Sequence, residues 1–404
     1  MFRCHFFADV VGPYDVYGGT RAAALRNATH LPINDPTLLV PAMATATEHL
    51  GFGYTSSIMQ YHPFTFARLI STLDHLTKGR VAWNIVTSFT KSAARSYGLN
   101  NLPEHDQRYA MADEHTQLCY RLWEESWAEG AVLKDKKRGI YVDPSKVHDI
   151  NHDDEYYSVH GCHLCEPSPQ RTPVLFQAGA SDRGTDFAAE NAECIFVIGA
   201  NAHVAGDYAR AIRSEMASLG RRGDDVRCFA YMKIIAGSSE AEAQARYKEY
   251  FAQGSYEGAL ALLCAWTGID FSHYAPDQPI EYIETNAVRT VVHSFTAADP
   301  TRTWTLRDVA KFVGIGGAGP VLVGAPEQIA EQLEEWIAAG VDGFNLSCAT
   351  LPATFVDFIE GVVPVLQKRG RMQTSYRPGT LREKLFEGRP ARLQLPHPAA
   401  ACRK

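Results

Sequence analysis

Residues 79–98, with the sequence GRVAWNIVTSFTKSAARSYG, contain the strand on which the fold prediction rests. The first half, residues 80–86, is rich in β-branched and aromatic residues and shows no alternation between polar and apolar positions. This pattern is typical of a strand that is covered on both faces, as in a parallel sheet. The sequence then becomes polar, so that Asn84, Thr87 and Ser88 place an amide and two hydroxyls near the predicted carboxyl end of the strand.

These three polar residues allow two interpretations. Ligands of α/β folds bind at the carboxyl ends of the strands, which favours a ligand site lined by the three side chains. In the alternative interpretation, Asn84 satisfies backbone groups in a sharp turn, and Thr87 and Ser88 cap the next segment.

Six other segments have strand character, and most of them are followed by a helical pattern such as the one that opens at Pro63. Together with residues 80–86, they give seven predicted strands: residues 2–8, 52–58, 80–86, 173–177, 194–198, 227–236 and 341–346. The links are short except for insertions at about 129–172 and 254–321. The repeat predicts an α/β fold, a (β/α)8 TIM barrel that forms a single domain over residues 1–386, followed by a C-terminal tail over residues 387–404.

Seven predicted strands are one fewer than such a barrel contains. Because the first strand begins almost at the first residue, we expect the barrel as written to lack its first β/α unit. Such a barrel would expose two sheet edges, so we expect reduced stability or activity and association into a homo-oligomer. An open doubly wound sheet is the alternative architecture, although it usually has fewer strands.

The composition describes a mildly acidic, soluble protein. The 404 residues carry a formal net charge of −7 and offer no basic footprint for nucleic acid. Residues 1–9 lack the long apolar region of a signal peptide, and no segment approaches the length of a membrane span. Nine cysteines at irregular spacing fit reduced thiols better than a disulfide framework. We therefore expect a cytoplasmic protein without a nucleic-acid or membrane partner.

Two stretches look like binding motifs but lack the necessary context. Residues 314–319, GIGGAG, could be a dinucleotide-binding loop only with a strand before and a helix after, and Pro320 follows immediately. We interpret them as a turn. A second stretch offers His148, His152, His160, Cys162, His163 and Cys165 as metal ligands. It contains a single Cys-x-x-Cys pair, so we predict no metal site.

The carboxyl ends of barrel strands meet on one face, so polar residues at those ends should form one pocket. Residues at or just beyond such ends are Asp9, Ser57, His62, Asn84 and Ser181. Ser181 lies where a loop enters a helix, and it could hold a phosphate with free backbone N–H groups or act as a plain N-cap. Tyr109, in the helix after the central strand, is either a phenolic donor to that site or an ordinary core tyrosine.

Five longer motifs occur together and in one order: WNIVTS at 83–88, HDQRY at 105–109, HLCEPSPQRTP at 163–173, QAGAS at 177–181 and DGFNL at 342–346. With these motifs the chain, from about residue 7 to 386, resembles the flavin-dependent monooxygenases of the bacterial luciferase superfamily. The most similar branch contains nitrilotriacetate, dibenzothiophene-sulfone and long-chain alkane monooxygenases.

The resemblance implies a luciferase-like barrel that takes reduced FMN from a separate NAD(P)H:flavin reductase. It also implies that the enzyme uses O2 to insert one oxygen atom into a small organic substrate, either a xenobiotic sulfur or nitrogen compound or an aliphatic chain. By position, Asp9, Ser57 and Asn84 would lie near the flavin ring and ribityl chain. Tyr109, Ala180 and Ser181 would hold the phosphate, and His62 would be the catalytic residue.

Other functions stay open at this point. A non-catalytic flavin-binding paralogue would keep the same site without turnover, as a consequence of the missing first unit. Deazaflavin-dependent oxidoreductases share the superfamily, but the five motifs argue against them. In the alkane branch a histidine follows the Thr-Ser pair, whereas this chain has Phe89 at that position, which argues against an alkane substrate.

Overall fold

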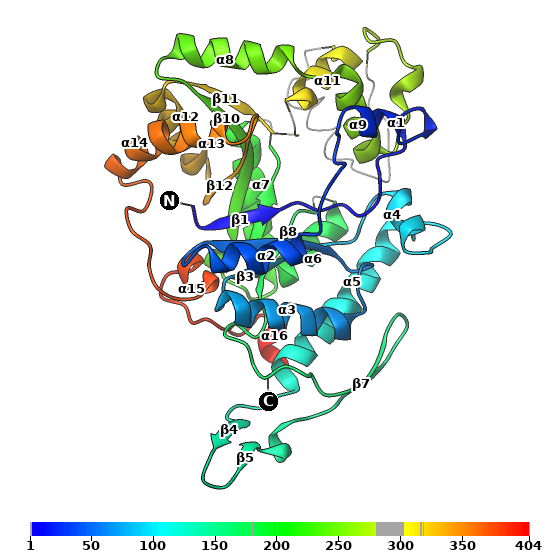
Figure 1. The fold of residues 1–404 in the computed structure, drawn as a ribbon, viewed down its shortest axis with the longest axis vertical. Helices are drawn as coiled ribbons and strands as arrows, with labels where there is room; N and C mark the ends of the chain where they lie inside the picture. The colour runs from blue at the N-terminus through cyan, green and yellow to red at the C-terminus, as the bar shows by residue number, and fades with distance from the viewer. Residues whose placement is uncertain are drawn as a thin grey trace.

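The computed structural model describes residues 2–179, 181–199, 201–279, 303–315, 317 and 319–403. At its centre parallel strands form a curled sheet with helices on its outer face (Figure 1). The strands are β1 (Cys4–Phe7), β2 (Gly51–Ser57), β3 (Val81–Val86), β8 (Val174–Gln177), β9 (Cys194–Val197), β10 (Arg227–Ala236), β11 (Val321–Gly324) and β12 (Gly343–Ser347). They pair in the order β1-β2-β3-β8-β9-β10, and β10 continues to both β11 and β12.

Helices follow most strands and confirm the predicted β/α repeat. They are α2 (Pro36–Thr45), α3 (Pro63–Thr77), α4 (Lys91–Ser96), α5 (His105–Tyr120), α6 (Asp182–Asn191), α7 (Ala202–Ser218), α8 (Glu240–Ala252), α12 (Pro326–Ala339), α13 (Ala353–Asp357) and α14 (Val363–Lys368). The local signals act as expected in α3, where Pro63 occupies the first turn and Lys78 ends the helix with a φ of 56°.

The prediction of seven strands is wrong, because β11 adds an eighth strand to the sheet. Its four residues follow the glycine-rich turn directly and pair with residues 233–236 of β10. So short an apolar run cannot be separated from the surrounding loop by periodicity.

The two insertions carry structure of their own. Residues 129–172 form the antiparallel hairpins β4 (Val132–Asp135) with β5 (Ile140–Val142) and β6 (Ile150–Asp153) with β7 (Ser158–Gly161). The second insertion contains α9 (Tyr256–Thr267) and α11 (Leu306–Gly314), which pack against each other, and α1 (Ala22–Arg26) packs on α9. Figure 1 shows this helical group apart from the hairpins, beyond the right-hand end of the sheet.

Side chains alternate along each strand between the helix-covered face and the inside of the barrel. On β3, Trp83 and Ile85 join the outer core, so Ala82 and Asn84 point inward. On β10, Ala230, Met232 and Ile234 belong to the outer core. Phe229, Tyr231 and Lys233, at the alternate positions of β10, therefore face the interior.

Aromatic rings from β1, β8, β9 and β10 fill part of that interior. The ring centroid of Phe196 lies 4.4 Å from that of Phe6 and 5.3 Å from that of Phe176. Phe229 stacks on Phe176 at 6.2 Å. Polar side chains also point into the interior, for example Thr55 on β2 and Asn84 on β3, and Asn84 lies beside Phe176 in the register of β3 with β8.

Within the described residues, β1 and β12 are not paired with each other. A cavity of about 480 Å³ lies between them and is lined by both strands, by Phe229 and by side chains of α12 and α14. Most of its lining is apolar, including Phe2, Leu333 and Ile337. The sheet is thus open along one seam.

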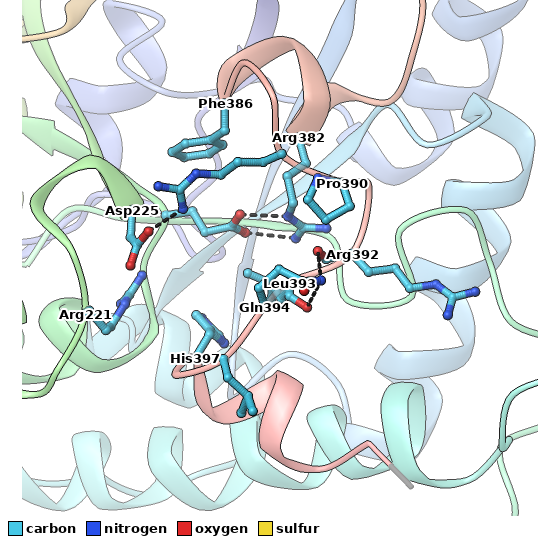
Figure 2. A pocket seen from close by; sticks show the side chains of 12 residues that line it. Arg221, Asp225, Arg382, Phe386, Pro390, Arg392, Leu393, Gln394 and His397 are labelled. Atoms are coloured by element: carbon cyan, nitrogen blue, oxygen red, sulfur yellow. Dashed lines mark hydrogen bonds and ion pairs between the residues drawn. The ribbon is translucent and has the colours of Figure 1, made fainter.

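Near the amino ends of strands β8 and β9, an ion pair joins Glu193 to Arg382, and Figure 2 labels Arg382. Glu193 precedes β9, and Arg382 belongs to α15 (Leu381–Leu385). Arg382 Nε lies 2.7 Å from Glu193 Oε1, and Nη2 also donates to the carbonyls of Thr172 and Pro173 before β8. The second carboxylate oxygen accepts from the Leu175 N–H at 3.1 Å. Both charged side chains are almost fully buried.

Residues 387–404 were predicted as a tail, and the described part of it, residues 387–403, packs against this end of the barrel. Leu393 and Ala399 join the main core. His397 is buried, and its Nε2 hydrogen-bonds to the Asn191 carbonyl at 2.9 Å. Figure 2 shows His397 on the same side of the pocket as Arg221. Arg403 donates to Glu124, which is fully buried.

Replacing Glu193 by Gln should destabilise the protein by about 3–5 kcal/mol, because it leaves the Arg382 guanidinium buried without a counter-charge. Urea unfolding of the variant and the parent measures the loss. The matched control is Glu387→Gln, which removes the partner of the exposed Arg377 and should leave the midpoint unchanged. Equal midpoints for all three proteins would contradict the role given to the buried pair.

Candidate active site at the mouth of the barrel

Asn84 presents an unused hydrogen-bond acceptor to the inside of the barrel. Its Nδ2 donates to Thr55 Oγ1 at 3.1 Å, while its Oδ1 has no partner although the residue is only 5% exposed. Buried polar atoms are rarely left without a partner, and such an atom often marks a place for a ligand. The interpretation of Asn84 as a group that only satisfies its own turn is therefore less well supported.

Ser57 and Ser88 join the ends of β2 and β3. The Ser88 hydroxyl donates to Ser57 Oγ at 2.8 Å, and Ser57 Oγ also accepts from the Met59 N–H at 3.2 Å. Ser88 has a φ of 60°, an uncommon conformation for a residue other than glycine that tends to occur at functional sites. The predicted Ser57 therefore has a second hydroxyl beside it.

Asp9 follows β1 and is half-buried. Burial raises its pKa, and the nearby Asp35 carboxylate raises it further. Burial also raises the pKa of Tyr97, with a smaller contribution from the charge of Asp9. The Tyr97 hydroxyl is buried and has no hydrogen-bond partner. The Asp9 carboxyl and the Tyr97 phenol thus lie near each other in a partly desolvated region just beyond the end of β1.

His62 is the N-cap of α3, where its Nδ1 accepts from the Phe64 N–H at 3.4 Å. The imidazole is exposed and meets the ring of Tyr157, which directly precedes β7 of the second hairpin, edge to face at 5.9 Å. Behind it, burial lowers the pKa of His115 to about 4, and His62 adds to that lowering. His62, the predicted catalytic residue, is therefore exposed at the rim of the barrel mouth, and its Nδ1 already accepts a hydrogen bond from the backbone.

Tyr109 and Ser181 meet at the start of α6. Ser181 is the N-cap and accepts from the Gly184 N–H at 3.1 Å. A Cβ at Gly179 or Gly184 would lie 2.7 Å from the Tyr109 hydroxyl oxygen, so only glycine fits on either side of this phenol. Tyr109 hydrogen-bonds with Ser181 and is buried. The two residues and the helix N-terminus form the kind of cradle that binds phosphate.

Two residues of this cradle were not among the predicted site residues. His105 Nε2 lies 3.1 Å from Ser181 Oγ, and Gln177 Oε1 accepts from the Gly179 N–H at 2.7 Å. Both belong to motifs quoted for the family resemblance, which was the available signal. Arg183 pairs with Asp113 and lies over the Tyr109 ring, 5.5 Å from its centroid. Ala180, predicted to hold the phosphate, lies outside the described residues.

The described His and Cys side chains of residues 148–165 do not gather into a ligand set. In the part of the chain that the structure describes, the one group with metal-binding spacing is Glu114, His152 and Asp154. Its Glu114 carboxylate is already engaged by His152 and by the N–H groups of Tyr156 and Tyr157. These contacts anchor the β6–β7 hairpin on α5.

The sequence model of one protein family, the luciferase-like monooxygenases, matches residues 18–343. The chain belongs to this family.

Two curated luciferase-like monooxygenases show how similar the relatives are. The chain is 50% identical over 403 residues to the dimethyl-sulfide monooxygenase of Hyphomicrobium sulfonivorans, covering all of this chain and 84% of that protein. It is 44% identical over 403 residues to the long-chain alkane monooxygenase of Geobacillus thermodenitrificans, covering all of this chain and 87% of that protein.

Solved structures confirm the barrel. The crystal structure of the Hyphomicrobium sulfonivorans protein superposes with a TM-score of 0.92 over 100% of this chain and 86% of that chain, at 50% identity. A riboflavin lyase solved with a modified FMN and riboflavin, 35% identical, superposes with a TM-score of 0.90 over 99% of this chain and 88% of that chain.

As a luciferase-like monooxygenase, the protein is an oxidoreductase, and the family predicted from the five motifs is confirmed. None of the described helices is long and apolar enough to cross a membrane. The residues at the mouth also fit a flavin nucleotide, because the unused Asn84 Oδ1 offers an acceptor and the Tyr109–Ser181 cradle offers donors.

Replacing Tyr109 by Phe should weaken FMN binding by about tenfold or more, because it removes a hydroxyl that can donate to a charged phosphate. Riboflavin lacks the phosphate, so its affinity should stay unchanged. Fluorescence quenching titrations with both flavins measure the two effects.

The control is Tyr120→Phe on the same helix, whose hydroxyl bonds the Asn191 side chain at 3.0 Å away from the cradle. This variant should bind both flavins like the parent. A loss of riboflavin affinity in Tyr109→Phe equal to the loss of FMN affinity would show that Tyr109 does not serve the phosphate.

Proposed function

We propose that the protein is the oxygenase of a two-component system, which takes reduced FMN from a separate flavin reductase and uses O2 to oxygenate a small organic molecule. The observation that carries the proposal is the pairing of an open acceptor, Asn84 Oδ1, with a glycine-lined hydroxyl cradle around Tyr109 at the carboxyl ends of one barrel. When bound, reduced FMN supplies two electrons and the place where O2 reacts. One oxygen atom enters the substrate and the other leaves as water.

The residues of this chain would bind and orient the flavin. Tyr109, Ser181 and the backbone N–H groups at the start of α6 would hold the phosphate. Asn84 would accept from a ring N–H, and Ser57 would contact the ribityl chain or the ring. Asp9 and His62 stand at the rim, where they could hold or move a proton. The aromatic rings around Phe176, which lies beside Asn84 in the sheet, would help to keep water from the bound flavin.

The substrate class follows from the relatives rather than from the site. One relative that is half identical is named for dimethyl sulfide, and another is named for long-chain alkanes. We propose a small sulfur- or nitrogen-containing compound or an aliphatic chain, and dimethyl sulfide is the first compound to test. Phe89, where the alkane branch has histidine, favours the sulfur compounds over alkanes.

The decisive experiment is an anaerobic titration with oxidised and reduced FMN, followed by mixing with 18O2 and dimethyl sulfide. We expect tighter binding of reduced FMN and one 18O atom in the product by mass spectrometry. Asn84→Ala should weaken the binding of both flavins and lower the yield of labelled product. Flavin binding with no labelled product from any of the sulfide, amine and alkane substrates tested would instead support a non-catalytic flavin-binding protein.

A further inference from the structure

Lys233 is a buried cation on the inner face of β10. It is 3% exposed, and its side chain points inward because its neighbours Met232 and Ile234 belong to the outer core. It is the seventh of the ten residues of β10 and so lies towards the carboxyl end, beyond the aromatic Phe229. Lysine is almost never fully buried unless it is paired.

Only neutral groups accept hydrogen bonds from Lys233 in the part of the chain that the structure describes. Nζ donates to Ser347 Oγ at 3.2 Å and to the Cys348 carbonyl at 3.1 Å. The Ser347 hydroxyl also hydrogen-bonds with Tyr231. The buried Arg382, by contrast, is neutralised by Glu193. An ammonium has three N–H donors, so the described residues leave one of them open to a further acceptor.

The position of Lys233 separates it from the residues that would hold the flavin. In the sheet order β2-β3-β8-β9-β10, the strand that carries Lys233 is four places from β2 and three from β3. Because the sheet curls, β10 forms the wall across the interior from Ser57 and Asn84. A flavin ring held at β2 and β3 would leave this opposite wall to the substrate.

We propose that Lys233 and Ser347 form an anion-binding subsite for the substrate, so that the protein prefers organic molecules with a carboxylate or sulfonate group. This inference rests on the proposed function and narrows its substrate class. A desolvated ammonium without a counter-charge is unfavourable, and a bound anion would neutralise it through a charge-assisted hydrogen bond.

The charge of Lys233 also predicts how binding depends on pH. Burial lowers the pKa of Lys233 to about 8, so the ammonium persists at pH 7. The titratable groups that face it are Tyr231 on β10 and Cys348 after β12, and burial raises the pKa of Tyr231, which keeps that phenol neutral. Anion affinity should therefore be full at pH 7 and fall as the pH rises above about 8.

The test compares hexane-1-sulfonate and hexanoate with the uncharged hexan-1-ol, by isothermal titration calorimetry on the full chain with and without FMN. At pH 7 we expect both anions to bind at least about tenfold more tightly than the alcohol. Lys233→Met should abolish this difference and Lys233→Arg should preserve it. Lys248→Met, which removes an exposed lysine of α8, should bind like the parent.

Thermal unfolding and circular dichroism of each variant verify that it is folded. A folded Lys233→Met protein that still prefers the anions would overturn the proposal. So would a variant that loses affinity for reduced FMN alone, because the lysine would then serve the cofactor. Anion binding that depends on Lys233 in a chain that binds no flavin would support the subsite while rejecting the monooxygenase function.

Discussion

The buried contact between Glu193 and Arg382 holds together parts of the chain that are far apart in sequence. It joins the start of β9, the backbone before β8 and helix α15 in one desolvated place. A buried charge pair tolerates little displacement, since losing either partner leaves the other unsatisfied. The amino ends of the strands are thereby fixed. The carboxyl ends, which carry the candidate site, are free to differ in their loops, as in other barrels.

The inside of the barrel is lined by both aromatic and polar side chains. Rings such as Phe176 and Phe196 fill part of it, and hydroxyl, amide and ammonium groups line the rest of the described strands' inner face near Asn84 and Lys233. Polar groups inside a dry space interact more strongly with a ligand than they would in water. This arrangement explains how a few residues such as Asn84 and Tyr109 could select a ligand without a large charged surface.

The strands and helices with strong periodic signals were predictable from the sequence, and β10 agrees with its prediction at both ends. Strand β11 was not predictable, because four apolar residues beside a glycine-rich turn carry no period. Within that stretch Gly317 has a packing role, since a Cβ there would overlap the Tyr231 hydroxyl. Ser181 and Tyr109 were predicted and do meet. His105 was missed because its contact with Ser181 joins distant segments, and Gln177 was missed although it belongs to one of the motifs quoted for the family. Lys233 was visible as a charge within an apolar strand, but only the fold reveals that it points inward.

Strand β10 pairs with three other strands, whereas β1 and β12 are not paired with each other in the described residues. These two features have opposite consequences for local opening of the barrel. All ten residues of β10 lie within a ladder with β9, β11 or β12, so we expect its amide hydrogens to exchange with solvent more slowly than those at the seam. The amides of β1 and β12 that border the cavity should exchange through smaller local openings. The barrel should therefore open first at this seam, and the strand that carries Lys233 should be among the last parts to open.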